Sequence, residues 1–400
     1  MPGKCPVHEL DVPFDATFYA DPYPVYARLR EDAPIHRVCL PEGPPVWLVT
    51  RYADVSELLK DRRLVRNRRH SNGDYTVEII PEFVRDGNLH MEDGDLHTRL
   101  RRFMNFAFTP KRIEAMRDVI VDETARLLDE IEKNGGGDLM TLLAAPLPIS
   151  ITIELLGIPR DMGGEFREWS DGLLGGKLDE ARAAGKALLE FIYRLIERKR
   201  AEPGDDLMSH WIFSVDEDGK PLTEQEMVGM TFFLVIGGYD TTVGSMGSSI
   251  LALLTQPDKA ERLREEPALV PAAVEELLRW DGSAHNALRR FAIEDMEIAG
   301  QQIAKGDTVI LSISSANRDP RHFLQPDVLD FDRESPKEHW AFGRGAHHCP
   351  GKELARVEIQ IMLDMLLKRF PNMTLDASAE EVVWRPNYII RSPRKIMVTV

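Results

Sequence analysis

The stretch that decides the fold is Phe342-Gly-Arg-Gly-Ala-His-His-Cys349-Pro-Gly351, in which a cysteine follows a glycine-rich loop. Pro350 and a long helical pattern come next, and because Pro favours the first turn of a helix, Cys349 is predicted at or just before a helix N-terminus. The unpaired N–H groups and the positive dipole end stabilise an anion there, which for a cysteine means a thiolate. Side chains that would block a flat ligand are absent at Gly343, Gly345 and Gly351.

A thiolate beside a flat, open surface is what a haem iron takes as its fifth ligand. The alternatives are a buried structural cysteine, a plain surface loop, or a zinc or copper site built from His347, His348 and Cys349. Three adjacent residues cannot easily face one tetrahedral ion, and the sequence has no second Cys/His cluster to complete a set of four ligands. The loop therefore favours haem.

The spacing F-x-x-G-x-x-x-C-x-G resembles that of the haem-binding loop of the cytochromes P-450. The resemblance implies a mainly α fold, with a single large helical domain and small β-sheets over residues 1–400. It also implies haem b with Cys349 as axial thiolate ligand to the iron, and Phe342, His347 and Gly351 in the cofactor site.

The bulk composition is that of a soluble globular protein, with 43% hydrophobic and 29% charged residues among 400. A net charge of −16 argues against nucleic-acid binding. The three cysteines give no even disulfide framework and suit a reducing compartment. The N-terminal sequence has no apolar signal core, so we expect a cytoplasmic protein with no membrane anchor.

Helical periodicity dominates the chain, and strand-like runs are few and short. Residues 134–137, Asn-Gly-Gly-Gly, are expected to form a loop, and the Gly-rich residues 162–176 suggest a mobile lid. The chain has neither a G-x-G-x-x-G after a strand nor a Walker-type loop, so NAD(P) and flavin are not expected and electrons must come from another protein. Helices are predicted at 22–32, 54–60, 96–107, 111–132, 187–200, 224–254, 258–265, 270–280 and 351–369, and strands at 35–39, 46–50, 296–298, 308–313 and 395–400.

A second motif, Gly237-Gly-Tyr-Asp-Thr-Thr242, lies inside the long apolar stretch 224–254. One interpretation is close helix packing with Asp240 capping a kink. The resemblance instead implies the oxygen-side helix of the cytochromes P-450, where small residues make room for dioxygen. Thr241 would open a backbone hydrogen bond and support oxygen activation, and Asp240 would relay protons.

Glu276 and Arg279 stand at i and i+3 on one helix face, an arrangement that is most often a solvated pair of little energetic worth. The resemblance implies that they form the E-x-x-R element. In that case the pair is buried, is joined by Arg333 and has a structural role.

Haem propionates need cations, and the resemblance supplies candidates. His97 and Arg101 match an H-x-x-x-R pattern, Arg290 matches a strand arginine with Arg289 as its rival, and His347 precedes the cysteine by two residues.

Basic residues without an intervening acid gather between 96 and 113, which predicts a docking face for an acidic ferredoxin or flavodoxin unless it is only a solvated helix face. A second cluster at 62–69 would suit an anionic substrate or carrier, or a solvated run. The first cluster comprises Arg99, Arg101, Arg102, Lys111 and Arg112, with Arg344 and Lys352 expected near it.

Substrate contacts implied by position are mostly apolar, so a hydrophobic small molecule is expected. His285 and Asn286 are polar, and as a guess one of them orients a substrate oxygen. The predicted contacts are Phe233, Ile236, Gly237, Asn286, Ala287, Ile389 and Ile390.

These features predict a monooxygenase that inserts one atom of dioxygen into a hydrophobic molecule. A haem-thiolate peroxygenase and a haem-binding sensor or carrier are the alternatives, and Asp240 with Thr241 argues against both. A cysteine hydrolase fails because no His–Asn/Asp set pairs with Cys349. The substrate, the oxidised position and the native redox partner cannot be predicted, and a monomer is the default oligomeric state.

Overall fold

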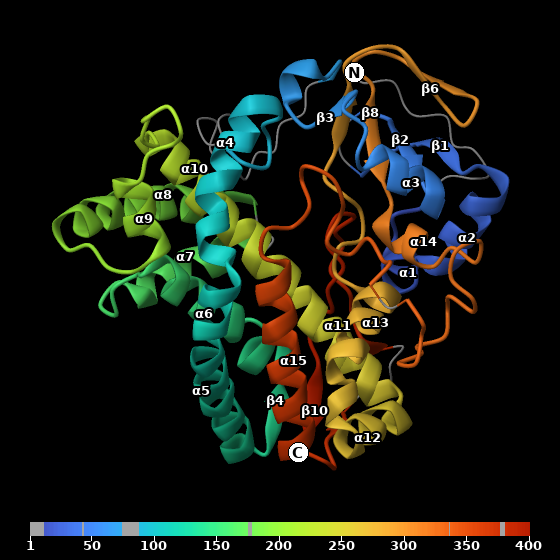
Figure 1. Ribbon diagram of the computed structural model, residues 1–400. Helices are drawn as coiled ribbons and strands as arrows, with labels where there is room; N and C mark the ends of the chain where they lie inside the picture. Colours follow the sequence, from blue (N-terminus) through green and yellow to red (C-terminus); the bar gives the residue numbers. More distant parts are fainter. Residues whose placement is uncertain (1–11, 42–43, 74–87, 175–177, 336, 377–380) are drawn as a thin grey trace.

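The computed structural model describes residues 12–41, 44–73, 88–174, 178–335, 337–376 and 381–400. Helices make up the left and lower parts of the molecule in Figure 1, and a five-stranded sheet with the first helices lies at the upper right. The helices are α1 (Ala16–Ala20), α2 (Tyr23–Asp32), α3 (Tyr52–Leu58), α4 (Gly94–Asn105), α5 (Pro110–Asn134), α6 (Pro146–Leu156), α7 (Gly163–Leu174), α8 (Leu178–Ala201), α9 (Leu207–Phe213), α10 (Glu224–Val235), α11 (Thr241–Thr255), α12 (Pro257–Glu265), α13 (Val270–Asp281), α14 (Ile313–Asn317) and α15 (Lys352–Arg369).

Short 3₁₀ and π-helical turns connect several of these helices. They are η1 (Arg68–His70), η3 (Phe106–Phe108), η4 (Met140–Ala144), η5 (Ile236–Asp240) and η6 (Pro267–Leu269). The strands are β1 (Ile35–Val38), β2 (Val46–Val49), β3 (Leu64–Val65), β4 (Gly136–Asp138), β5 (Arg290–Ala292), β6 (Met296–Ile298), β7 (Gln301–Ile303), β8 (Thr308–Leu311), β9 (Thr374–Leu375) and β10 (Met397–Thr399). The predicted fold class, mainly α with small sheets, is confirmed.

The largest sheet has the strand order β1-β2-β8-β5-β3, with β2 and β8 parallel and the other neighbours antiparallel. It places Arg290 on β5, between β8 and β3. The remaining sheets are β4-β10-β9 and the hairpin β6-β7. The large sheet therefore carries the predicted strand arginine toward the helical half of the molecule.

The predicted loop and the described part of the expected lid contain regular structure, and residues 175 and 176 of that lid lie outside the described residues. Gly136–Asp138 forms β4, which pairs with β10, and a Cβ on Gly136 would lie 2.1 Å from the carbonyl oxygen of Val398. Glycine is needed there because two strands approach closely. The expected lid at 162–176 contains helix α7, which packs on α8.

Several other elements were missed or shortened, and two of them show the physical reasons. Helix α6 has prolines and β-branched residues and is buried on most sides, so its apolar residues show no 3.6-residue period. The strand expected at 308–313 ends at Leu311 because the side chain of Ser312 caps α14, accepting the N–H of Ser315.

Glu224–Thr255 is continuous helix through α10, η5 and α11 and is long and apolar enough to cross a membrane. Yet 78% of its most apolar window is buried inside the protein. Its apolarity is therefore accounted for by packing in the core.

The cysteines differ from the expected reduced set. Cys39 is disulfide-bonded, whereas Cys349 is free. The prediction that the chain has no disulfide framework is therefore wrong at Cys39.

Candidate active site

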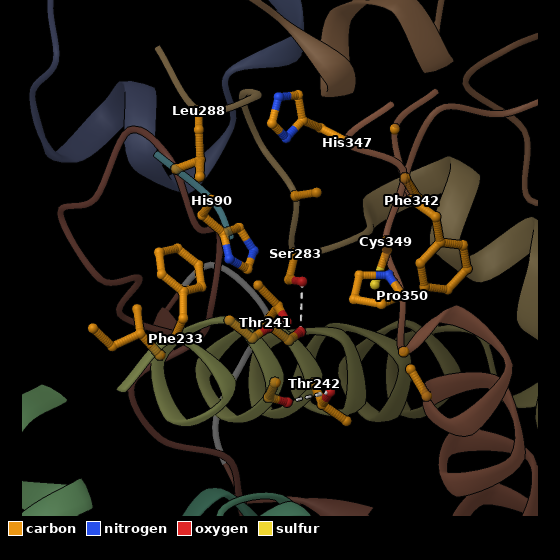
Figure 2. Close-up of a pocket in the computed structure, with 18 of the residues that line it drawn as sticks. His90, Phe233, Thr241, Thr242, Ser283, Leu288, Phe342, His347, Cys349 and Pro350 are labelled. Atoms are coloured by element: carbon orange, nitrogen blue, oxygen red, sulfur yellow. Dashed lines mark hydrogen bonds between the residues drawn. The ribbon is translucent and has the colours of Figure 1, made fainter. Parts of the chain in front are cut away.

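A deep cavity lies between the cysteine loop and the helix α10–η5–α11. Figure 2 shows Cys349, Pro350 and Phe342 on one side of it, with His90 and Phe233 across from them above the helix. All predicted cofactor residues line this cavity: His97, Arg101, Arg290, Phe342, His347, Cys349 and Gly351. Residues as far apart in the sequence as His97 and Gly351, 254 positions, therefore meet at one place.

The cysteine loop is held by backbone contacts. The N–H of Cys349 donates to the carbonyl oxygen of Phe342 over 2.9 Å. Gly343 and Gly345 have φ angles of 65° and 78°, which glycine adopts without strain. A Cβ on Gly345 would lie 2.8 Å from the carbonyl oxygen of Leu59. Gly345 does not line the cavity. A glycine is therefore needed there for close packing of the loop, and not, as expected, for the approach of a flat ligand.

The thiol of Cys349 lies two residues before Gly351, the N-cap of α15. Burial raises its pKa, while the N–H of Gly351 and the charges of Arg101, Arg356 and Lys352 oppose this effect. Burial is the larger effect, so the helix terminus favours a thiolate but does not set the protonation of the sulfur by itself. A cation bound to the sulfur would be needed to hold the thiolate.

The oxygen-side helix opens at the predicted motif. Ile236–Asp240 is a π-helical turn, and the hydroxyl of Thr241 donates to the carbonyl oxygen of Gly237 over 2.6 Å. Thr242 donates in the same way to Gly238 over 2.8 Å. Such π-turns widen a helix and often mark functional sites. Both threonines line the cavity.

Asp240 is 4% exposed and pairs with Arg385, whose side chain is 26% exposed. It is not among the residues lining the cavity, although the next residue, Thr241, is. The acid therefore lies between a half-buried cation and the cavity.

The predicted brace behind the cysteine loop is present. Arg279 donates to both carboxylate oxygens of Glu276 over 2.7 Å, and Arg333 donates to the same carboxylate over 3.0 Å. Arg279 also donates to the carbonyl oxygens of Asn317 and Pro326. The side chains of Glu276 and Arg279 are fully buried. The pair ties α13 to the chain segment that leads to the cysteine.

Cations gather at the end of the cavity beside β3 and β5. Arg290 is 3% exposed, and its Nε is buried with no hydrogen-bond partner among the described residues. Arg289 instead bonds the hydroxyl of Tyr388 and does not line the cavity, so the structure favours Arg290 over its rival. Arg101 donates to the carbonyl oxygen of His348 over 2.6 Å.

The two histidines of this group lie against each other, with ring centroids 4.2 Å apart. Burial lowers the pKa of His97 to about 4 and that of His347 to about 3. His347 also contacts Asp93 over 3.0 Å. Hydrogen bonds from His347 and the backbone lower the pKa of Asp93 although burial opposes them. At neutral pH the histidines are therefore uncharged and Asp93 is ionised.

Arg66 joins this group, which the sequence analysis did not predict. It is 8% exposed and lines the cavity, and its Nε is buried without a partner in the part of the chain that the structure describes. Asp93 accepts from its backbone N–H over 2.7 Å. Burial lowers the pKa of Arg66 to about 9 and that of Arg290 to about 10. In the sequence Arg66 directly follows the apolar pair Leu64-Val65, which could have indicated a buried position. Four neighbouring arginines made it look like part of a solvated run.

These residues fit a haem. Buried arginine nitrogens without partners need an anion, which the propionates would supply, and Cys349 faces the middle of the cavity (Figure 2). The described residues hold no cluster of three His, Cys, Asp or Glu side chains suited to a metal ion, which disfavours the zinc or copper alternative.

The predicted substrate contacts all line the cavity: Phe233, Ile236, Gly237, Asn286, Ala287, Ile389 and Ile390. The Asn286 amide, however, donates to the carbonyl oxygen of Tyr388. His285 is 3% exposed, contacts the hydroxyl of Tyr26 over 2.6 Å and does not line the cavity. His285 therefore does not support the guess that it orients a substrate oxygen, whereas the buried Oδ1 of Asn286 has no partner among the described residues and is compatible with it.

Two further cavity residues were missed. His90 precedes α4 and lies over Phe233. Glu358 on α15 is 4% exposed, and its Oε2 has no partner within the described ranges. Burial raises the pKa of Glu358 to about 8, so its carboxyl is protonated at neutral pH. Neither residue belongs to a motif, and only the folded chain brings them to the cavity.

The predicted basic face is largely neutralised. Arg99 pairs with Asp216 and Glu226, Arg102 pairs with Glu217 over 2.7 Å, and Arg112 pairs with Asp205. The local excess of positive charge in the sequence is therefore offset by acids that follow α8 and α9. Exposed cations with no carboxylate partner among the described residues remain at Lys111 and Arg344, while Lys352 is half-buried and lies 4.0 Å from the carboxylate of Glu353.

The cluster at 62–69 does not form one surface. Arg63 pairs with Asp61 over 2.7 Å, and Arg66 points into the structure. The sequence alone could not separate the buried arginine from its solvated neighbours.

Comparisons with known proteins agree with this geometry. Residues 154–400 match the family model described as Cytochrome P450. The chain is 37% identical over 399 residues to the polyketide biosynthesis cytochrome P450 PksS of Bacillus subtilis, covering 97% of this chain and 98% of PksS. It is 39% identical over 386 residues to the cytochrome P450 monooxygenase PikC of Streptomyces venezuelae, covering 95% and 91%. The solved structure of PksS superposes with a TM-score of 0.90 over 97% of this chain and 99% of that one, at 37% identity.

Proposed function

Because the chain belongs to the cytochrome P450 family, and is therefore a haem-thiolate monooxygenase that acts on hydrophobic molecules, we propose a role for each residue of its active site. The observation that carries the proposal is the meeting of Cys349, the π-helical turn before Thr241 and the unpartnered arginines around one cavity. Haem b, when bound, supplies the iron at which dioxygen is activated.

Cys349, which lines the cavity, would hold the iron through its sulfur. At the propionate end, Arg66, Arg101 and Arg290 carry three positive charges, and Asp93 offsets one. Two propionates would balance the other two. The charge count therefore includes Arg66 as a third propionate arginine, beside the predicted Arg101 and Arg290.

Replacing Arg66 by Leu is expected to speed loss of haem to apomyoglobin by about tenfold or more, since breaking a buried ion pair leaves an uncompensated charge. Without haem the same variant should be at least as stable as the parent protein, because it lacks a buried arginine whose Nε has no partner. Arg69→Leu, at an exposed position nearby, is the control. Equal rates of haem loss in the two variants would contradict the assignment.

Thr241 and Asp240 would handle protons on the oxygen side. The Thr241 hydroxyl is held by Gly237, which fixes its direction, and Asp240 lies next to it against Arg385. The Asp240 carboxylate would alternate between its contact with Arg385 and a contact with water in the cavity. In this way it would carry protons from the surface to Thr241. This role uses both residues of the predicted pair.

The reducing partner is proposed to be an acidic ferredoxin or flavodoxin that docks over the cysteine loop. Arg344, which is exposed, and Lys352, whose side chain is 40% exposed, flank Cys349, so they would meet an acidic partner close to the iron. The ion pairs of Arg99, Arg102 and Arg112 argue for a smaller contact than the sequence predicted. A monomer remains the expected state.

Lys352→Glu is expected to slow reduction by an acidic ferredoxin about fivefold to tenfold at low salt, with the difference shrinking as salt screens the charges. Stopped-flow reduction under carbon monoxide measures the rate. Lys186→Glu on α8 makes the same charge change away from the cysteine and should have no such effect. Equal slowing by both variants would place the docking face elsewhere.

A further inference from the structure

One polar side chain on the oxygen side of the cavity has no partner of its own. Among the described residues, Thr241 and Thr242 donate to the carbonyl oxygens of Gly237 and Gly238, and the Asn286 amide donates to Tyr388. The hydroxyls of Ser245 and Ser283 contact each other over 2.8 Å, and the Ser283 hydroxyl also donates to the carbonyl oxygen of Thr241. His90 remains: its Nδ1 is buried without a partner in this part of the chain, and no hydrogen bond of its Nε2 occurs there. The Oδ1 of Asn286 is also buried without a partner, but the amide that carries it is already held by Tyr388.

The backbone fixes where His90 lies. The side chain of Asn88, which is 1% exposed, accepts the N–H groups of His90 over 3.0 Å and of Met91 over 3.1 Å. Such an Asx turn sets the direction in which His90 leaves the chain. Its position is therefore determined before any ligand enters.

The ring of His90 stacks on Phe233, with centroids 3.1 Å apart and planes within 16°. A Cβ on Gly237 would lie 3.5 Å from its Cε1 and Nε2, so the ring edge lies directly above the oxygen-side helix. Figure 2 shows this ring on the side of the cavity opposite Cys349, near Leu288 and Thr241. An imidazole held in this way faces the space where a substrate must lie to be oxidised.

The surroundings select the charge of the group that His90 would bind. Burial, and then the charges of Arg66, His347, Arg101 and His97, lower the pKa of His90 well below its ordinary value. The ring therefore stays uncharged and offers one donor and one acceptor. Much of the remaining cavity lining is apolar, including Leu89, Phe233, Leu234, Ala287 and Leu288. With the arginine charges balanced by propionates, neither a carboxylate nor an ammonium would find a partner here.

We propose that His90 is the polar anchor of the substrate, and that it hydrogen-bonds an uncharged carbonyl, hydroxyl or amide group of an otherwise apolar molecule. This inference rests on the proposed function, since it places the substrate between His90 and the haem. The hydrogen bond would orient the molecule over the oxygen site while Phe233 keeps the imidazole in place.

The test uses the holoenzyme and three matched probes: undecan-2-one, undecane and undecanoate. Binding is followed by the low-to-high-spin shift of the Soret band. The parent protein is expected to bind the ketone about tenfold more tightly than the alkane and the carboxylate, which is the worth of one or two hydrogen bonds. His90→Phe keeps the stacking surface and should lose this preference without weakening binding of undecane. His90→Gln, which restores a neutral donor and acceptor, should recover part of it.

Three results would overturn the proposal: no preference for the ketone in the parent protein, equal weakening of ketone and alkane in His90→Phe, or faster haem loss in that variant with its ketone preference intact. The last would assign His90 to a propionate. The reduced carbon monoxide spectrum of each protein separates these results from failure of the proposed function. A thiolate spectrum with no ketone preference rejects the anchor alone, whereas absence of that spectrum rejects the haem-thiolate site.

Discussion

Arg279→Leu is expected to lower the free energy of unfolding by about 3 to 5 kcal/mol, the usual cost of leaving a buried charge without its partner. Glu276 would keep only Arg333 and the N–H of Asp330, 3.0 and 2.9 Å away, and the carbonyl groups of Asn317 and Pro326 would lose their donor. Since total stabilities are only about 5 to 15 kcal/mol, most of the variant should be recovered without haem or as aggregate.

The matched control is Arg262→Leu on the neighbouring helix α12. Arg262 also makes a two-pronged contact with a carboxylate, to Asp332 over 2.7 and 2.8 Å, but these side chains are 31% and 62% exposed. Exposed ion pairs contribute about 1 kcal/mol at most. Thermal unfolding and the ratio of haem to protein absorbance compare the two. If Arg279→Leu and Arg262→Leu lower the free energy of unfolding equally, the buried pair behind the cysteine loop contributes no more to stability than an exposed ion pair.

Thr241→Ala is expected to divert most reducing equivalents from product to hydrogen peroxide, lowering the fraction coupled to product about tenfold or more. The hydroxyl is the group that opens the helix at Gly237, and its loss removes the donor next to the oxygen site while the fold stays intact. Coupling is measured as product and peroxide formed per NAD(P)H consumed by a reconstituted ferredoxin system.

Thr242→Ala is the control, because its hydroxyl donates one residue further along to Gly238. It should retain the coupling of the parent protein, and Thr241→Ser should restore most of what Thr241→Ala loses. Unchanged coupling in Thr241→Ala would remove the residue from proton delivery.

The parts of the site that were predictable are those with fixed local spacing. The cysteine loop, the Gly237–Thr242 motif and the pair Glu276–Arg279 each lie within one loop or helix, so their chemistry can be read from neighbouring positions. The contact of Arg333 with Glu276 joins two segments, yet the resemblance implied it and the structure confirms it.

Residues whose role depends on distant segments escaped prediction. Arg66 looks like its exposed neighbours until β3 and β5 bury it, and His90 gains its place only when Asn88 turns it over Phe233. The basic face was overestimated for the same reason, because the acids that pair with Arg99 and Arg112 lie about a hundred positions later. Burial also reversed the expected pKa shift of the Cys349 thiol, which the helix terminus alone suggested.

The central claim is that Cys349 holds haem iron as a thiolate, and the reduced carbon monoxide spectrum of the purified protein tests it most directly. The parent protein should give the strongly red-shifted Soret band of a thiolate-ligated haem, and Cys349→Ala should lose that band. A band at the position typical of histidine-ligated haem in the parent protein, or a red-shifted band that persists in Cys349→Ala, would contradict the assignment.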